Sequence, residues 1–567
     1  MQLPLLRALR SPDAGSRLDD LIAGAITAIL LIPQGMAYAL LAGLPPELGL
    51  YASIIPPAIY ALFGTSRTLA VGPVAVAALM VANALAIYAG DDQSRWIDGA
   101  MILAAQTAAV LMLMRIFRLG VLVNFISHPV LSGFTTGAAI LIIISQIKHM
   151  TGLDVPRGEA AHTLMSIAQQ LPATNLVTLG FAAGAIVLLL LGRQSLSRAL
   201  QAAGLSTRSA GMISRAAPLL VVFIATALAA QLDAASRFDL SIVGAIPAGL
   251  PTPSLAFLSL PGWIELAPSA VLIALVGYVE SISVAKVLAA RRKQKIDANQ
   301  ELTALAVTNF AAAAAGTMPV AGGFSRSVVN FEAGAQTQLA AIITAALVAV
   351  VALFFTGWFH HLPQAVLAAI IVVAVTQLID IKGARSIFAY DRGDGATLVA
   401  TMIGTLVLGI EAGLVAGIVL ALGLYLKRTS APHMAVLGRV PGTEHFRNTQ
   451  RHHVDCDQRL LIIRVDENLY FANTAAVEAY IEAQIDQAPG IRYVLLVMSA
   501  VSYIDASALE QLELLEESLR HRDNELHLSE VKGPVMDRLQ TTRLGQLLAT
   551  RRIHLSTHMA VKALTGA

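Results

Sequence analysis

Long apolar runs separated by short polar breaks occupy the chain from residue 18 to about residue 426. An apolar run of about 20 residues is long enough to cross a bilayer as a helix. The pattern therefore predicts an α-helical polytopic membrane protein with about fourteen spans. The clear runs are 21–41, 48–63, 98–114, 121–145, 174–192, 216–231, 266–290, 337–356, 359–379, 395–409 and 411–426, and the shorter or interrupted runs are 73–89, 300–315 and 324–336.

The pattern changes from about residue 430 onward. Strand-like runs such as RLLIIRV (459–465), YVLLVMS (493–499) and NELHLSEV (524–531) alternate there with segments of helical spacing. This alternation predicts a small α/β domain with a sheet flanked by helices. We therefore divide the chain into a transmembrane domain, 1–430, and a tail domain, 431–567.

The composition agrees with this division. Hydrophobic residues make up 56% of the chain and charged residues 13%, against roughly 25% charged in a typical soluble protein. The single cysteine, Cys456, excludes an internal disulfide and a cysteine-based metal site. Because the histidine pairs 360–361 and 452–453 have no carboxylate at helical spacing, we expect no metal.

Basic residues recur in every second loop of the predicted membrane domain. With the N-terminus inside, the loops that carry Arg67, Arg115, Arg193, Arg291 and Lys382 all fall on the cytoplasmic side. Cytoplasmic loops of membrane proteins carry an excess of Lys and Arg. We therefore expect a multi-pass protein of the cell (inner) membrane with both termini and the tail domain in the cytoplasm.

Two interrupted segments occupy matching places in the two halves of the membrane domain. TLAVGPVAVAALM begins at Thr68 and TMPVAGGFSRSVV begins at Thr317, which is 249 positions later. Interrupted helices at corresponding positions are typical of secondary transporters built from inverted repeats. We therefore predict a seven-plus-seven inverted repeat, with repeats at about 18–232 and 266–428.

The interruptions favour an anion site. Gly72-Pro73 and Gly322-Gly323 break the helices, and each new helix N-terminus acts like roughly half a positive charge. Arg326 in the first turn of the second half-helix adds a full charge and a planar fork suited to oxyanions, and Ser325 can add a hydroxyl donor. The alternative is that Arg326 lies at a cytoplasmic end and extends to the water.

Three further polar residues lie in apolar runs. Glu280 in GYVESISVAK has no basic neighbour within one helical turn. If it faces Arg326, proton uptake by Glu280 would free the arginine for an anion; the alternative is a structural Glu280–Arg326 ion pair. Gln34 and Tyr38 could donate hydrogen bonds to a substrate or could bond between helices.

In the tail, Ser507 and Glu510 have the spacing of a capping box that starts a helix. A phosphate on Ser507 would also be stabilised by a helix N-terminus. Regulatory phosphorylation of Ser507 is therefore a second reading of this residue.

Several of these segments together resemble a known family. DDLIAGAITAILLIPQGMAYALLAGLPPELGLY, FGTSRTLAVGPVA, VESISVAK and GGFSRSVVN are similar to segments of the SulP family of sulfate-permease-like anion transporters. The tail, with its IDAS motif, resembles the STAS domain that follows the membrane domain in that family. The resemblance covers nearly the whole chain.

The resemblance implies a uracil-permease-like fold with a core domain (spans 1–4 and 8–11) and a gate domain (spans 5–7 and 12–14). It also implies elevator-type motion, a homodimer, and an anion site between spans 3 and 10. By motif, the implied site residues are Gln34, Tyr38, Val74, Ala75, Phe324, Ser325 and Arg326, with Glu280 at the place of a proton-linked glutamate and Ser507 at the place of a phosphorylated serine.

The function we expect is secondary active, proton-coupled uptake of sulfate without a bound cofactor. The alternatives are sodium-coupled bicarbonate transport, C4-dicarboxylate transport, and a passive anion exchanger or channel. A membrane sensor that signals through the tail to a cytoplasmic partner is a further alternative. No phosphate-binding loop, metal-ligand cluster or Ser/His arrangement in the sequence supports an enzyme, and we expect no nucleic-acid partner.

Overall fold

The computed structural model describes residues 14–90, 92–120, 127–155, 160–549 and 551–566. Its contacts divide the chain into two compact units, Met1–Val419 and Leu420–Ala567. The boundary predicted at residue 430 stays a prediction. Residues 1–13, part of the N-terminus expected in the cytoplasm, and residues 121–126, where the span 121–145 was expected to begin, lie outside the described residues.

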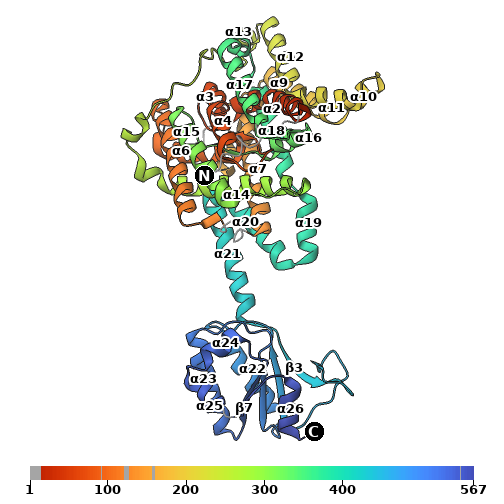
Figure 1. The fold of residues 1–567 in the computed structure, drawn as a ribbon. Helices are drawn as coiled ribbons and strands as arrows, with labels where there is room; N and C mark the ends of the chain where they lie inside the picture. Colours follow the sequence, from red (N-terminus) through yellow and green to blue (C-terminus); the bar gives the residue numbers. More distant parts are fainter. Residues whose placement is uncertain (1–13, 91, 121–126, 156–159, 550, 567) are drawn as a thin grey trace. The chain divides into compact units, whose positions relative to one another are not determined.

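The first unit is helical apart from two very short strands (Figure 1). Its first half contains α2 (Ala14–Leu41), α3 (Pro46–Tyr51), α4 (Ile55–Phe63), β1 (Val71–Gly72), α5 (Ala75–Ala89), α6 (Gln93–Ile116), α7 (His128–Thr151), α8 (Ala160–Gln170), α9 (Leu176–Gln194), α10 (Leu196–Ala202), α11 (Thr207–Arg215), α12 (Ala217–Gln231) and α13 (Ala234–Phe238). Its second half contains α14 (Trp263–Arg291), α15 (Ala298–Ala314), β2 (Ala321–Gly322), α16 (Phe324–Glu332), α17 (Leu339–Phe354), α18 (Gln364–Val375), α19 (Ile381–Tyr390) and α20 (Arg392–Leu408). The boundary between the two units falls within α21 (Ile410–Ser430).

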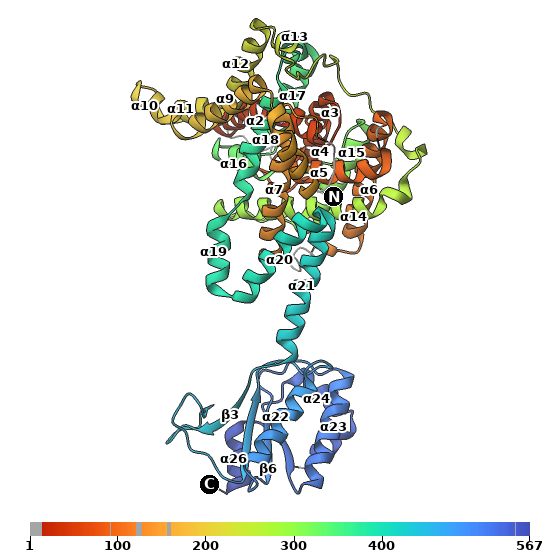
Figure 2. The same cartoon turned by 180° about the vertical axis from the view of Figure 1, so that it is seen from behind.

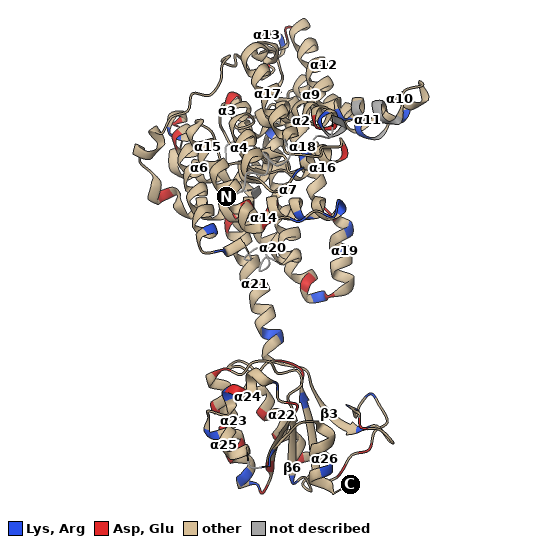
Figure 3. Ribbon diagram, viewed as in Figure 1, with Lys and Arg blue, Asp and Glu red and all other residues tan. Residues whose placement is uncertain are grey.

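Many of these helices have the length and composition of membrane spans. Within the described ranges, 7 helical segments are long and apolar enough to cross a bilayer, and α5, α12 and α17 are shorter apolar helices. Charged residues are sparse along these helices, and basic residues lie on α19 at the edge of the unit (Figure 3). The unit therefore has the character of a polytopic membrane domain, while the count of fourteen spans stays a prediction.

Small residues let the helices of this unit approach closely. A Cβ atom built on Gly49 of α3 would lie 2.0 Å from the carbonyl oxygen of Gly35 on α2. No larger residue fits there, because the backbone of one helix occupies the space of the other's side chain. Close contact through small residues is the usual way in which membrane helices pack, since lipid gives them no hydrophobic drive to associate.

The second unit is the predicted α/β domain. Its six-stranded sheet has the order β4-β3-β5-β6-β7-β8, with β5 to β8 parallel and β3 antiparallel to both neighbours. The elements are β3 (Met434–Arg439), β4 (Phe446–Asn448), β5 (Leu460–Val465), α22 (Thr474–Gln487), β6 (Tyr493–Val497), α23 (Ala506–His521), β7 (Glu525–Ser529), α24 (Gly533–Leu539), α25 (Arg543–Leu548), β8 (Ile553–His554) and α26 (Thr557–Thr565).

Helices cover both faces of this sheet (Figure 2). The predicted strands 459–465 and 493–499 are β5 and β6, which are almost wholly buried. The strands β3, β4 and β8 and the helix α26 were not predicted. These strands are short or lie toward the edges of the sheet, where the hydrophobic pattern is weak.

A histidine pair lies between two strands of the tail. The Nδ1 atom of His527 on β7 is 3.2 Å from the Nε2 atom of His554 on β8, and the two rings stack. His527 is only 4% exposed. Burial, reinforced by the neighbouring His554, lowers the pKa of His527 to about 4, although Glu525 opposes the shift. Both rings are therefore neutral at pH 7.

Candidate functional site

The two interrupted segments meet in the structure. β1 and β2 pair antiparallel, with Val71 opposite Gly322 and Gly72 opposite Ala321. Each strand leads directly into a helix, α5 after β1 and α16 after β2. The crossing therefore brings two helix N-termini together from parts of the chain about 250 residues apart, as the matched segments predicted.

Neither of these helix ends has a side-chain cap. Val74 and Gly323 occupy the cap positions of α5 and α16 without a capping hydrogen bond, whereas Asp92 and Asp297 cap α6 and α15. The first-turn N–H groups of a helix have no acceptor within it. Six such groups, those of Ala75, Val76, Ala77, Phe324, Ser325 and Arg326, remain without a hydrogen-bond acceptor among the described residues.

Arg326 lies within this crossing. Its side chain is 2% exposed, and its Nη1 atom donates to the carbonyl oxygen of Pro73 at 2.6 Å. Its Nε and Nη2 atoms are buried and have no hydrogen-bond partner in the described part of the chain. The alternative that Arg326 extends to the water is therefore wrong, and the arginine presents two unused donors inside the protein.

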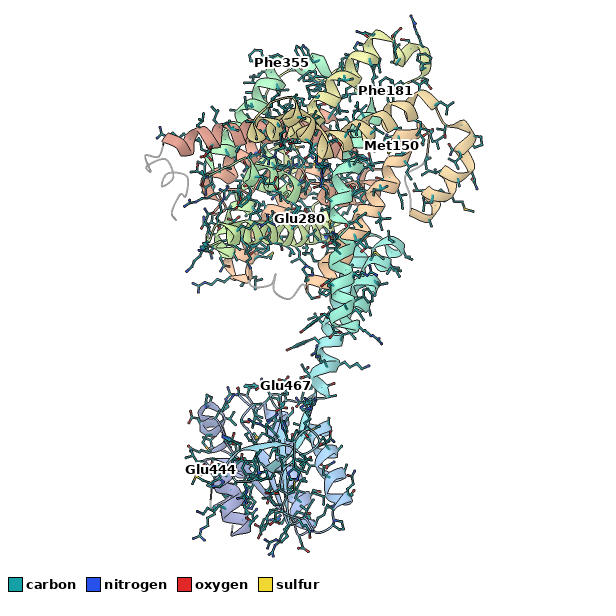
Figure 4. All side chains as sticks on the ribbon, turned by 90° about the vertical axis from the view of Figure 1, so that its right-hand side faces the viewer. Met150, Phe181, Glu280, Phe355, Glu444 and Glu467 are labelled. Atoms are coloured by element: carbon teal, nitrogen blue, oxygen red, sulfur yellow. The ribbon has the colours of Figure 1, made fainter. Side chains whose placement is uncertain are left out.

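Glu280 and Tyr38 lie near this arginine. Both interact electrostatically with Arg326, and Figure 4 labels Glu280 on α14. Among the described residues no ion pair or hydrogen bond joins Glu280 to Arg326. The expected proximity is present, but the locking ion pair weighed as its alternative is absent from this structure.

The other expected site residues surround the crossing. Gln34 and Tyr38 are buried on α2, which packs against α5 and α16. Leu31, one turn before Gln34, approaches Gly72, so the helical spacing of Leu31, Gln34 and Tyr38 puts all three on the face toward β1. Neither polar side chain bonds to another helix within the described ranges.

The residues at the starts of α5 and α16 differ in how far they are exposed. Val74 and Ala75 are buried at the start of α5. Ser325 is half-buried, and Phe324 at the start of α16 is 41% exposed. Every expected membrane-domain residue therefore lies on α2, α5, α14 or α16 or, for Val74, directly before α5, and these helices meet at the crossing.

Two asparagines were missed in the sequence and hold the crossing. The buried Asn309 side chain accepts from the Val320 N–H at 2.9 Å and donates to the Val320 carbonyl at 3.0 Å. Asn330 of α16 donates to the carbonyl of Thr68. An amide side chain within an apolar run could have indicated these two residues in the sequence, because polar groups in membrane segments are energetically costly and usually have a structural or functional role.

Glu301 is a second buried carboxylate in this unit and has a different environment. It is 1% exposed and accepts from the Tyr60 hydroxyl, the Thr65 N–H and hydroxyl, and the Ser66 N–H. Four donors satisfy a buried carboxylate fully. Glu301 thus fixes the loop that leads from α4 to β1, whereas no hydrogen bond to the Glu280 side chain is found among the described residues.

The structure corrects the reading of Ser507 in the tail. Asp505, and not Ser507, caps α23, and its carboxylate accepts from the Ala508 N–H at 2.8 Å. Ser507 is exposed within the first turn. A cavity of about 320 Å³ beside this turn is lined by Tyr503, Asp505 and Arg538 among others. The regulatory role of Ser507 stays a prediction.

Comparison with known proteins identifies the family that this chain matches. The sequence profile of the Sulfate permease family matches residues 18–401, and that of the STAS domain matches residues 451–560. Sulfate transporter 4.1, chloroplastic, of Arabidopsis thaliana is 35% identical over 96% of this chain and 79% of its own length. A probable sulfate transporter of Mycobacterium tuberculosis is 33% identical over 96% of this chain and 94% of its own.

Solved structures share the fold. The murine Solute Carrier 26 family member A9 anion transporter in the inward-facing state has a TM-score of 0.90 at 23% identity, covering 100% of this chain and 94% of that chain. The transmembrane domain of a cyanobacterial bicarbonate transporter has a TM-score of 0.60 at 21% identity, covering 72% of this chain and 98% of that chain. With its permease domain followed by a STAS domain, this chain belongs to the sulfate permease family, which is a family of transporters and not of enzymes.

Proposed function

We propose that this protein is a secondary active transporter that takes up sulfate together with protons. The observation that carries the proposal is the state of Arg326, whose buried Nε and Nη2 atoms lack a partner among the described residues. Two uncapped helix N-termini flank it. The two helix ends contribute roughly one positive charge and the guanidinium a second, so the crossing suits a dianion.

The relatives support sulfate as the substrate. Those reported above from Arabidopsis thaliana and Mycobacterium tuberculosis are named as sulfate transporters or probable sulfate transporters. In this proposal Gln34, Tyr38 and Ser325 donate to the anion through their side chains. The N–H groups at the starts of α5 and α16, beside Val74, Ala75 and Phe324, supply the remaining hydrogen bonds.

Glu280 is the proposed site of proton coupling. A deprotonated Glu280 would compete with a bound dianion for the field of Arg326, and a protonated Glu280 would not. The absence of an ion pair to hold the carboxylate, within the described residues, leaves it free to change protonation. Sulfate entry would therefore accompany a proton. Sodium would need a cation site, and no group of three or more His, Cys, Asp or Glu residues that could hold a metal ion is found in the described part of the chain.

We further propose fourteen spans in two inverted repeats of seven, in domains 1–430 and 431–567. In this proposal a core of spans 1–4 and 8–11 carries the anion across the membrane against a gate of spans 5–7 and 12–14. The antiparallel crossing of β1 and β2, one from each repeat, supports the inverted relationship. A homodimer in the cell (inner) membrane with cytoplasmic termini completes the proposal.

Bicarbonate is the second candidate substrate, and one observation favours it. A solved transporter with the same membrane fold is named as a bicarbonate transporter. C4-dicarboxylate transport and passive anion exchange would use the same kind of anion site. The first would differ in the larger size of the anion, and the second in the lack of coupling to a proton gradient.

Uptake of radiolabelled sulfate into liposomes that contain the purified protein tests the proposal. An inward proton gradient should drive sulfate above its equilibrium distribution, and an inward sodium gradient at constant pH should not. Bicarbonate, chloride, fumarate and succinate are tested as competitors in parallel. Sulfate movement only down its own gradient would favour a passive exchanger, and movement of a competitor without sulfate would overturn the substrate.

A further inference from the structure

Two buried serines near the crossing make the same pair of hydrogen bonds. The Ser281 hydroxyl on α14 donates to the Gly277 carbonyl at 2.5 Å and accepts from the Gly322 N–H at 2.8 Å. The Ser327 hydroxyl on α16 donates to the Gly323 carbonyl at 2.6 Å and accepts from the Ala70 N–H at 2.9 Å. Each serine therefore joins one turn of its helix to the backbone of the strand crossing.

The sequence around the two serines is matched. Residues 277–281 read GYVES and residues 323–327 read GFSRS, so each stretch has a glycine, a charged residue at the fourth position and the serine at the fifth. The charged residues are Glu280 and Arg326. The residue that precedes each serine is thus the charged group of the proposed site.

We propose that Ser281 and Ser327 are positioning residues that hold Glu280 and Arg326 at a fixed separation on the strand crossing. This inference rests on the proposed function, because Glu280 and Arg326 have their roles only in anion transport. The hydroxyl of Ser327 fixes the first turn of α16, which carries Arg326, to the segment that leads into β1. The hydroxyl of Ser281 fixes the turn of α14 that carries Glu280 to β2.

Burial makes these bonds hard to replace by water. Ser281 is 1% exposed and Ser327 is 0% exposed. One turn before Ser281, a Cβ atom on Gly277 would lie 3.3 Å from the Ala321 side chain, so α14 presses against β2 here. Removing either hydroxyl leaves a buried backbone N–H without a partner, which the structure can relieve only by shifting the helix against the strand.

The chain contains a matched control. Residues 49–53 read GLYAS, and the buried Ser53 hydroxyl donates to the Gly49 carbonyl at 2.7 Å. No strand N–H among the described residues bonds to Ser53, and no charged residue precedes it. Ser53→Ala therefore removes the same back-bond within a turn and leaves the crossing intact.

The experiment compares Ser281→Ala, Ser327→Ala and Ser53→Ala in the full-length protein in liposomes. Ser327→Ala should raise the KM for sulfate about tenfold, because Arg326 loses its fixed place. Ser281→Ala should shift the pH of half-maximal uptake by about half a unit and leave the KM at acid pH nearly unchanged. Ser53→Ala should change neither quantity.

Hydrogen exchange of the same variants in detergent gives a readout independent of transport. The Gly322 amide should exchange faster in Ser281→Ala and the Ala70 amide faster in Ser327→Ala, with both unchanged in Ser53→Ala. Unchanged exchange would overturn the bonds themselves. If these amides exchange faster but the KM and pH profile of uptake match those of Ser53→Ala, the positioning role is wrong. If the wild-type protein transports no anion, the proposed function itself is wrong.

Discussion

The guanidinium of Arg215 lies 3.2 Å from the carboxylate of Glu332. Arg215 ends α11, between the predicted sixth and seventh spans, and Glu332 ends α16, the half-helix that carries Arg326. Under the proposed elevator motion this ion pair joins the gate to the core. Both side chains are partly exposed, and an exposed pair contributes only about 0–1 kcal/mol, so it can open in each cycle.

Cross-linking this pair tests the elevator motion. In a Cys456→Ser background, which removes the single cysteine, Arg215→Cys and Glu332→Cys are joined with a flexible, reducible bifunctional thiol reagent. Sulfate uptake in liposomes should fall at least about tenfold after cross-linking, because α16 can no longer move relative to α11, and should return on reduction. The Cys456→Ser parent, treated alike, is the control, and full uptake in the cross-linked protein would contradict the elevator proposal.

Substitution of Arg326 tests the anion site. Arg326→Ala should lower sulfate affinity at least about a hundredfold, because the site loses both a charge and its paired donors. Arg326→Lys keeps the charge and loses the fork, so its affinity should fall about tenfold. Isothermal titration of the purified protein measures both. Arg95→Ala, which removes an arginine stacked on Tyr88 away from the crossing, should bind sulfate as the wild type does. Normal sulfate binding by Arg326→Ala would contradict the assignment of the anion site.

Substitution of Glu280 tests the proton coupling. Glu280→Gln should retain sulfate binding and lose the acceleration of uptake at acid pH, because an amide cannot take up the transported proton. Uptake at a series of external pH values measures this. The buried Glu301 supplies the contrast, because its carboxylate is already held by four donors. Glu301→Gln should lower thermal stability and keep the pH profile, and a Glu280→Gln protein that still responds to acid would rule out this residue as the proton carrier.

Acid should destabilise the tail domain through its histidine pair. The pKa of His527 is lowered in the folded domain to about 4, whereas an unfolded histidine titrates near 6.5. The unfolded state therefore binds more protons between these values, and stability is lost as the pH falls below about 6.5. Urea unfolding of the tail domain should show a loss of about 1–2 kcal/mol between pH 7 and pH 5 from this group. His527→Phe should reduce that loss, and an equal loss in the variant would contradict the assignment.

Much of the site could be predicted from the sequence because it depends on local chemistry. The glycines at 72, 322 and 323 and the proline at 73 fall together in two apolar runs, where they disfavour a continuous helix. Charged residues such as Arg326 and Glu280 are energetically costly in apolar runs, so their presence indicates a functional role. The residues that hold the crossing together were harder to find. Ser281, Asn309 and Glu301 look like ordinary polar residues of helices until their partners are known.

The start of α23 shows how local reasoning fails. Ser507 and Glu510 have capping-box spacing, yet Asp505 two residues earlier takes the cap. Both side chains can accept from a helix N–H, so the spacing alone cannot choose between them. The loop from β6 through Ile504, which bridges to Leu469, sets where the helix begins.

The sequence by itself determined the membrane domain, the tail domain and the two helix breaks, because apolar length and backbone-breaking residues act within a few turns of chain. Only the tertiary structure decided that residues 71–72 pair with 321–322 and that the Arg326 side chain ends beside Gly72 and Pro73 with two donors unused. It also decided that Ser281 bonds to Gly322 of β2 and that Ser327 bonds to Ala70, directly before β1. Hydrogen bonds between residues hundreds of positions apart have no periodicity in the sequence, and they exist only once helix packing has fixed which backbone groups are left to pair.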